Sequence, residues 1–230
     1  MHLELPRVRL DSFKDFLKHY LMIVLSILTA LGLEAWIEHA HHEHAAAAAS
    51  AQIEAELETN LAYIRRVRGN DAQRLASLKQ LDAYLVDAVK HGIDDATIAR
   101  QVDTQTEGSF YLGLELPKLR HEAWDVAVAN QAASWIDADR LRRYATIYAY
   151  QNDFERRISF NTSLNLAGAK VNDVDADLRS GTVQPREIMH TVNAMMSSVG
   201  DTVVMLDAIE QAFQRELPRL SAATSAPPRG

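Results

Sequence analysis

The pattern of hydrophobic and polar positions is dominated by an uncharged run of fourteen residues from Tyr20 to Leu33, YLMIVLSILTALGL. Fourteen residues are short for a membrane span, which needs about 20. Apolar residues on both sides, from Phe13 to Ile37, extend the apolar face to about 25 residues, or roughly 37 Å of helix. Tyr20 and Trp36 lie where interfacial aromatic residues are expected. The pattern therefore predicts a transmembrane anchor near the N-terminus.

The charges beside this span are distributed unequally. Four positive residues precede it, namely Arg7, Arg9, Lys14 and Lys18. The next Lys or Arg is Arg65. Because positive residues favour the cytoplasmic side of a span, we expect a cytoplasmic N-terminus and an exported remainder. A cleaved signal peptide also has a basic start and an apolar core. The small residues at 45–49 lie too far beyond that core for a comfortable cleavage site, so an uncleaved anchor is the preferred interpretation.

Beyond the span, apolar residues recur every three or four positions, which is typical of amphipathic helices. One such stripe consists of Ile53, Leu57, Leu61, Ile64 and Val67, and a second consists of Leu75, Leu78, Leu81, Leu85 and Val89. We expect a break between them at Gly69-Asn70. A second helix, from Asp71 to His91, would then fold back antiparallel on the first and end at Gly92.

Asp, Gly and Pro residues punctuate the rest of the chain and predict four more helices. The predicted elements are a short helix from Asp94-Asp95 to about Val102, a packed loop or brief strand at 103–117, a helix after Pro117, a long helix from Asp137 to Gly181, and a sixth helix from Pro185 to Pro218. In the sixth helix, core positions alternate at spacings of three and four, which is typical of coiled-coil-like packing. These positions are Val192, Met195, Val199, Thr202, Leu206, Ile209 and Phe213.

The predicted fold class is therefore all-α, with an N-terminal transmembrane helix that continues into an exported antiparallel helical bundle with coiled-coil-like packing. The predicted regions are a cytoplasmic tail at 1–11, the transmembrane anchor at 12–38, an exported helical domain at 39–217 and a disordered tail at 218–230. The pattern does not say whether the helix facing the sixth belongs to the same molecule, so a homodimer stays open.

Charge and composition narrow the possible partners. The formal net charge of −7 argues against nucleic acid, since binding to phosphates depends on clustered Lys and Arg. The chain has no Cys, so disulfides and thiolate metal sites are excluded. About 18 residues precede the span, too few for a kinase, cyclase or DNA-binding module. Any signalling would therefore need a protein partner besides the lipid bilayer.

The densest candidate chemistry follows the anchor directly, in EHAHHEH at 38–44. The candidate metal ligands are Glu38, His39, His41, His42 and His44. Glu38 and His41 have the Glu-x-x-His spacing of di-iron carboxylate bundles, and both side-chain types suit divalent transition metals. Such sites also need inward-facing Glu residues from two other helices, whereas the stripes above are apolar. A solvated helix face without a cofactor is the preferred interpretation, and a metal-binding or pH-sensing site is the alternative.

Other conspicuous residues favour structural roles. A second Glu-x-x-His pair, Glu187 and His190, is no more than chance expects. The aromatic residues Trp124, Trp135, Tyr144, Tyr148 and Tyr150 have the spacing of helix packing, and His121, Glu122 and Asp125 are interpreted as an exposed turn or a site. Gly-x-Ser-x-Gly and a glycine-rich phosphate loop are absent from the sequence, so no catalytic motif is found.

Three segments resemble a broad family of uncharacterised bacterial proteins with one N-terminal transmembrane helix and a helical exported region. They are YLMIVLSILTALGLEAWIEHAHHEH, HEAWDVAVANQ and DADRLRRYATIYAYQNDF. This chain has Glu34-Ala35-Trp36 where many of those proteins carry amides. The resemblance covers about half of the chain and implies a bacterial inner-membrane protein with its C-terminal domain in the periplasm. It implies no activity and no catalytic residues.

Together these observations predict a membrane-anchored helical scaffold or protein-interaction module without a catalytic site. A His/Glu-dependent metal-binding or pH-sensing protein at the membrane surface is the alternative function.

Overall fold

The computed structural model describes residues 13–159 and 162–224, and these residues are helical apart from their connecting segments. The elements are α1 (Phe13–Lys90), α2 (Asp95–Gln105), α3 (Glu122–Ala129), the short 3-10 helix η1 (Ala132–Trp135), α4 (Ala138–Ser159), α5 (Thr162–Ser180) and α6 (Pro185–Thr224). The described part of the chain contains no strand, which confirms the all-α prediction. The predicted cytoplasmic tail at 1–11 lies outside the described residues.

Helix α1 is 78 residues long, or about 117 Å at 1.5 Å per residue. The predicted break at Gly69-Asn70 is wrong, because α1 continues through both residues. The sequence contains a reason for this: the buried positions keep one alternation of three and four residues across Gly69. They are Ile53, Leu57, Asn60, Ile64, Val67, Asp71, Leu78, Leu81, Leu85 and Ala88, with partly buried Arg74 between Asp71 and Leu78. Asn60 and Asp71 are polar members of this series, so an apolar search divides it into two stripes.

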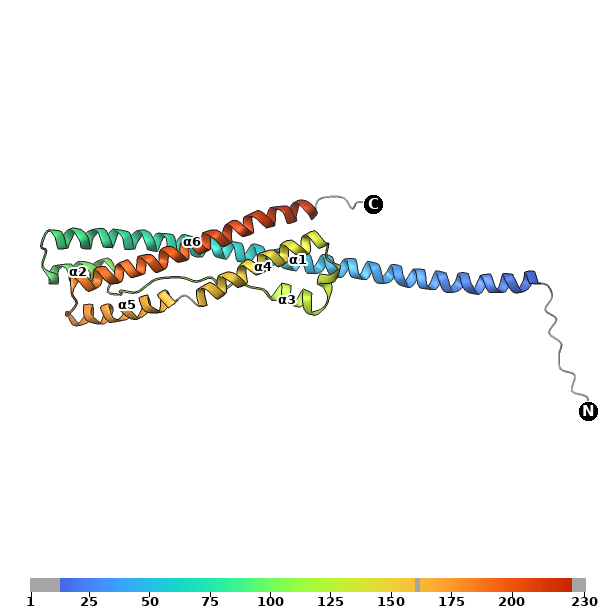
Figure 1. The fold of residues 1–230 in the computed structure, drawn as a ribbon, viewed down its shortest axis with the longest axis horizontal. Coiled ribbons are helices and arrows are strands. Elements are labelled where there is room, and N and C mark those ends of the chain that lie inside the picture. The colour runs from blue at the N-terminus through green and yellow to red at the C-terminus, as the bar shows by residue number, and fades with distance from the viewer. Residues whose placement is uncertain (1–12, 160–161, 225–230) are drawn as a thin grey trace, which may run out of the picture.

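The helices lie lengthwise beside one another, and α1 projects beyond all of them (Figure 1). Helix α6 runs back along α1 in the opposite direction and makes the most extensive packing with it, while α4 and α5 pack against α6. We call this assembly, from Ala45 of α1 onward, the helical body. α3, η1 and the start of α4 lie at the end of the body from which α1 emerges.

Two clusters of buried side chains form the core of the body. The one nearer the emerging part of α1 contains Ile53, Leu57, Tyr144, Leu206 and Phe213, and the distant one contains Leu85, Val102, Val174, Val192 and Met195. All seven predicted core positions of the sixth helix are at most 4% exposed. Their burial is therefore confirmed, and it takes place within a single chain.

Several predicted helix ends agree with the structure. Helix α1 ends two residues before Gly92, whose φ of 65° is accessible mainly to glycine. Asp94 accepts the N–H of Thr97 at 2.9 Å and caps α2, which extends three residues beyond the predicted Val102. Asp137 accepts the N–H of Arg140 at 3.0 Å at the start of α4. The predicted start of the sixth helix at Pro185 is confirmed.

Other boundaries differ. The helix predicted after Pro117 begins only at Glu122 and ends at Ala129, where Gln131 adopts a φ of 64° and η1 follows. The single helix predicted from Asp137 to Gly181 is described as two, α4 and α5, and the residues between them lie outside the described part. Helix α6 continues past Pro218 to Thr224, so the predicted stop at Pro218 is wrong. Of the predicted disordered tail, 225–230 lies outside the described residues.

Candidate functional site

The first part of α1 carries an apolar surface that nothing else in the described structure covers. Its large apolar side chains from Phe13 to Ile37 are exposed, and α1 is the one described helix long and apolar enough to cross a membrane. The hydroxyls of Ser26 and Thr29 donate to the carbonyls of Met22 and Leu25 at 2.8 and 2.7 Å. These polar side chains are thus satisfied within the helix, which a hydrocarbon environment requires.

The predicted histidine segment lies between this apolar surface and the body, on the same helix. His39 contacts Glu43 at 3.3 Å, and His42 contacts Glu38 at 3.6 Å, both at a spacing of four residues. His39, Glu43 and Glu38 are about 70% exposed, so these pairs contribute little to stability. His42 differs from its neighbours because its side chain is only 26% exposed.

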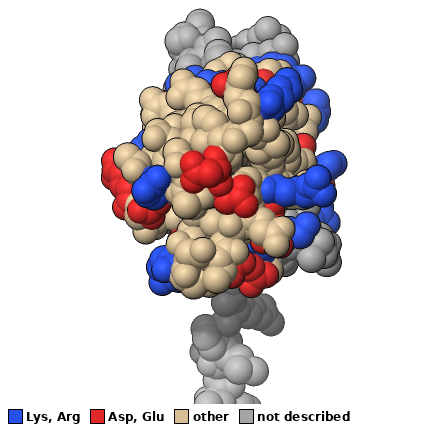
Figure 2. Space-filling model, turned by 90° about the vertical axis from the view of Figure 1, so that its left-hand side faces the viewer, with Lys and Arg blue, Asp and Glu red and all other residues tan. Residues whose placement is uncertain are grey.

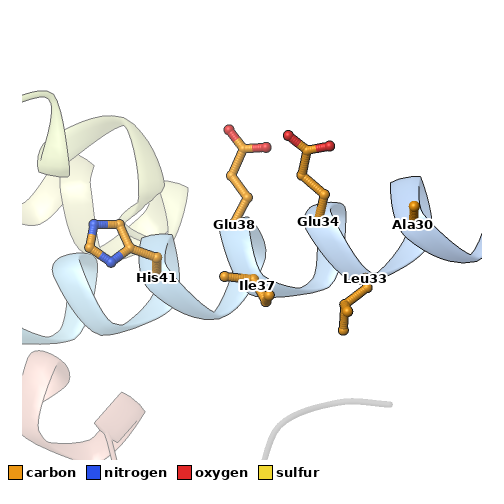
Figure 3. A pocket seen from close by; sticks show the side chains of 6 residues that line it. All are labelled: Ala30, Leu33, Glu34, Ile37, Glu38 and His41. Atoms are coloured by element: carbon orange, nitrogen blue, oxygen red, sulfur yellow. The ribbon is translucent and has the colours of Figure 1, made fainter.

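The five candidate metal ligands all come from one helix, α1. In Figure 3 the carboxylates of Glu34 and Glu38 extend to the same side, and His41 occupies the neighbouring turn. The hollow beside them is lined by Ala30, Leu33, Glu34, Ile37, Glu38 and His41, all from α1. Within the described residues, no three His, Asp or Glu side chains are grouped so as to hold a metal ion. A hollow along one helix is open surface and lacks the enclosure of a ligand pocket.

The partner that shields His42 is Trp135 of η1. The two rings stack with centroids 3.7 Å apart and planes inclined by 10°. Backbone geometry positions the indole: Gln131 adopts a left-handed conformation, and Ala132 and Ile136 on either side of the turn are buried. Trp135 itself is 52% exposed. The sequence predicted helix packing for Trp135, and the structure adds that it packs on the histidine segment and stays half open to its surroundings.

Further along α1, two glutamates accept hydrogen bonds from tyrosines of α4. Tyr144 donates to Glu54 at 2.7 Å, and Tyr148 donates to Glu56 at 2.6 Å. Glu56 also accepts the backbone N–H of Ala123 at 2.9 Å, which fixes the start of α3. Burial, and then the bond to the carboxylate, raise the pKa of both phenols well above the ordinary value of 10.0. The phenols therefore remain protonated donors, and their hydrogen bonds hold α4 against α1.

The segment 109–121 has no regular structure, and side chains of α1 bind its backbone instead. Asn60 pairs with Arg120, Asp71 accepts the N–H of Glu115 at 3.0 Å, and Arg74 donates to the carbonyl of Leu112 at 3.2 Å. Polar backbone groups of a packed segment need such partners. This confirms the packed loop predicted at 103–117 for residues 109–117, while 103–105 belong to α2.

Gly113 explains how the loop can lie so close to α1. Its φ is 66°, and a Cβ on it would be 2.7 Å from Nε of Arg74. The guanidinium of Arg74 also lies over the ring of Tyr111, 5.1 Å from its centroid. A residue with a side chain at position 113 would therefore displace the arginine that holds the loop.

Charged residues connect α1 with α6 beside the core. Nε of Arg65 and Nε of Arg68 lie 2.9 and 2.8 Å from the two oxygens of Glu210, and Arg68 also contacts Asp207 at 3.3 Å. The side chain of Glu210 is 7% exposed, so its charge is balanced by two guanidinium groups near a low-polarity core. This cluster favours one register of α6 on α1.

The far end of the body contains a groove of about 700 Å³ between the end of α1, α2 and the start of α6. Its lining includes Ile93, Asp94, Met189 and His190. Figure 2 views the molecule from this end and shows acidic and basic side chains distributed among neutral ones. His190 is therefore placed in a mixed surface groove, and Glu187 is not among the lining residues.

The predicted exposed turn at His121 lies on the surface of the body. His121 contacts Asp125 at 2.6 Å, and both side chains are more than half exposed. The hydrogen bond to Asp125 is the main cause that raises the pKa of His121. The contact joins His121, the residue before α3, to the first turn of that helix.

Comparison of the chain with protein-family models, with curated proteins and with solved structures finds no match. The functional interpretation therefore depends on the residues and contacts described above. Sequence reasoning missed Glu56, Asn60 and Asp71, which the structure places at the centre of the polar contacts. The unbroken alternation of three and four residues along α1 is the signal that could have identified Asn60 and Asp71 as buried.

Proposed function

We propose that the chain is a single-pass membrane protein whose helical body serves as a scaffold or protein-interaction module held at the membrane surface. The observation that carries this proposal is the continuity of α1. One unbroken helix has an exposed apolar surface in its first part and supplies the central packing surface of the body in the remainder. Such a helix suits an anchor that holds a folded body at a fixed distance from the bilayer.

The part of α1 between anchor and body is suited to transmit a movement of one to the other. No Gly or Pro interrupts the chain from Leu33 to Arg68, and Ala45 to Ala49 are five residues of the strongest helix-forming type. A partner that moves the body would therefore tilt or rotate the anchor, and the converse also holds. This rigidity favours a structural or coupling role over a tethered enzyme.

Within this proposal the body is an antiparallel helical bundle with coiled-coil-like packing. The support is the alternation of three and four residues at the buried positions of both α1 and α6. An extended interface between two long helices gives a body that stays rigid while its outer faces are available to a protein partner. A homodimer through another face is one form that such a partner can take.

The proposed location is a bacterial inner membrane, with a cytoplasmic N-terminus and a periplasmic body. The charge asymmetry around the span supports the orientation. The resemblance of the anchor and of the segments around Trp124 and Tyr148 to single-span bacterial proteins supports the compartment. Net negative charge favours protein and lipid partners over nucleic acid.

Topology and extraction test the proposal together. Alkaline phosphatase fused after Thr224 should be active, and the full chain should remain in the membrane pellet after a carbonate wash. Replacement of Arg7, Arg9, Lys14 and Lys18 by Glu should lower phosphatase activity, because the charge asymmetry that orients the span is lost. Release of a shortened protein that lacks residues 1–33 would refute the anchor.

A second candidate function, pH sensing by the histidine segment, is favoured by one contact. His42 lies between Glu38 and Trp135, so a change in its charge would act where the anchor helix meets the body. A His42→Gln variant would keep much of the shape of the side chain and remove the charge change. A pH-dependent difference in Trp135 emission that occurs in the wild type and not in this variant would support the second candidate.

A further inference from the structure

Trp135 is a large exposed aromatic residue at the end of the body from which α1 emerges. Trp135 is 52% exposed, although one ring face is covered by His42. Figure 1 places η1 at this end, beside the emerging helix. The first buried residue of α1 is Ala46, which is 8% exposed and lies one turn beyond His42. Trp135 thus marks the limit of the body on the side of the apolar segment.

The length of α1 places this limit close to a bilayer surface. The exposed apolar stretch from Phe13 to Ile37 is centred near Leu25, and a hydrocarbon core of about 30 Å takes up roughly ten residues on either side of that centre. Its outer boundary then lies near Ala35. The headgroup layer adds about 5–7 Å on each side. Seven residues from Ala35 to His42 correspond to about 10 Å, so the ring that stacks on His42 lies about 3–5 Å above the headgroup layer. A displacement of α1 by about two or three residues along the membrane normal brings the ring into that layer.

The charges around Trp135 do not select a lipid of one sign. Arg142 lies 3.3 Å from Asp139, and Arg143 lies 4.0 Å from Glu216, so these two basic residues at the start of α4 are paired with acids. The histidine segment likewise contains Glu38 and Glu43. The feature that remains unmatched is the exposed part of the indole, an amphipathic ring of the kind enriched at membrane interfaces.

We propose that Trp135 inserts into the headgroup layer of the membrane that α1 spans, so that the body rests on the bilayer at η1 and is held there at two points. This inference rests on the proposed anchor. The indole places its apolar surface toward the lipid and its N–H toward the headgroup oxygens. With η1 in contact with lipid and Trp135 stacked on His42, rotation of α1 about its own axis is restricted.

Depth-dependent quenching of tryptophan emission tests this contact with the full chain. The chain has three Trp residues, at 36, 124 and 135, so three single-tryptophan proteins are available. Each protein carries Phe at the other two positions and is reconstituted in phosphatidylcholine vesicles with or without spin-labelled headgroups. Trp124 is the matched control, because it is partly buried and stacks on Tyr148 at 5.2 Å within the body.

We expect the headgroup label to reduce the emission of Trp36 and of Trp135 and to leave that of Trp124 unchanged. The reduction at Trp135 should be the same in vesicles that contain anionic lipid, because the nearby charges are paired. Quenching of Trp36 without quenching of Trp135 would overturn the contact and leave the anchor intact. Absence of quenching at both positions would overturn the anchor as well. Trp135 could also be protected from the headgroup label in a way that disappears when the protein is diluted into excess lipid. That result would assign the indole to a contact with a second copy of the chain and refute the lipid contact.

Discussion

The side-chain amide of Asn60 holds the backbone of Arg120 by two hydrogen bonds, accepting its N–H at 3.0 Å and donating to its carbonyl at 2.7 Å. Asn60 is 1% exposed and lies among the apolar core positions of α1. One residue of the central helix therefore fixes the segment that leads into α3, η1 and Trp135. The position of the proposed membrane contact depends on this pair.

Replacing Asn60 with Ala should lower the free energy of unfolding by about 1–3 kcal/mol, because the N–H of Arg120 loses its partner inside the body. The carbonyl of Arg120 keeps the bond from Gln151 at 3.1 Å, so the loss is partial. Asn193→Ala is the control, since Asn193 is exposed and bonds only within its own helix to Met189. Chemical unfolding of both variants in nanodiscs measures the difference. Equal stability of the two variants would contradict the role assigned to Asn60.

The buried seam of α6 predicts a large effect at Leu206, which is 0% exposed. Leu206→Ala should cost about 2–5 kcal/mol, and Leu206→Asp should cost more because a carboxylate would enter an apolar layer. Val204→Ala, at a position 69% exposed, should have little effect. Because the seam is buried within one chain, the melting temperature should not depend on protein concentration. A melting temperature that rises with concentration would show that the seam joins two molecules, and sedimentation would then detect a dimer.

The tyrosine–glutamate pairs predict a loss of stability at alkaline pH. Burial raises the pKa of Tyr144 and Tyr148 in the folded state, so above about pH 10 the unfolded chain loses phenolic protons that the folded chain keeps. The free energy of unfolding should therefore fall as pH rises above 10, by up to about 1.4 kcal/mol per pH unit for each phenol. A Tyr144→Phe/Tyr148→Phe protein should lose this part of the pH dependence. Tyr150→Phe, at an exposed position, should keep it.

Asp71 predicts a pH dependence of the same sign, in the acidic range. Burial is the main cause that raises the pKa of its carboxyl, and the nearby Glu115 carboxylate adds to this, while the N–H of Glu115 opposes it. The folded state therefore favours the protonated form, so the contribution of Asp71 is most favourable below pH 3.8 and declines as pH rises through the folded-state pKa. The change in the free energy of unfolding caused by Asp71→Asn, measured against the wild type, should be more stabilising at pH 7 than at pH 4. Asp71→Ala should cost about 1–3 kcal/mol at pH 4, because the N–H of Glu115 loses its acceptor.

The histidine segment should divide into one structural residue and three solvated ones. His42→Ala should cost about 0.5–1.5 kcal/mol through loss of the stacking on Trp135. Combined replacement of His39, His41 and His44 by Gln should leave the melting temperature and the metal content of the purified protein unchanged. Elemental analysis of both proteins beside the wild type checks the second part. A stoichiometric loss of zinc, iron or nickel in the triple variant would restore the metal-binding alternative.

The sequence by itself determined the helical class, the uncharged span and several helix ends. These features depend on local rules, namely hydrophobic periodicity, the backbone freedom of Gly92 and Gly181, and the caps at Asp94 and Asp137. The apolar stripe of α6 could also be identified in advance, because each of its positions is an apolar or small residue at a regular spacing. The prediction of the anchor likewise depends on a local count of apolar and charged residues.

Only the tertiary structure decided that α1 continues through Gly69 and that buried polar residues hold the loop. A glycine inside a helix costs about 1 kcal/mol, which packing on both sides of it can offset. Asn60 and Asp71 fit the alternation of buried positions, but no local pattern shows the loop backbone that they bind. Tertiary packing also decided the position of Trp135 beside His42, since 92 residues of chain separate the two rings and no local pattern connects them. Long-range packing sets such contacts, because their free energy depends on partners that a local window of sequence does not contain.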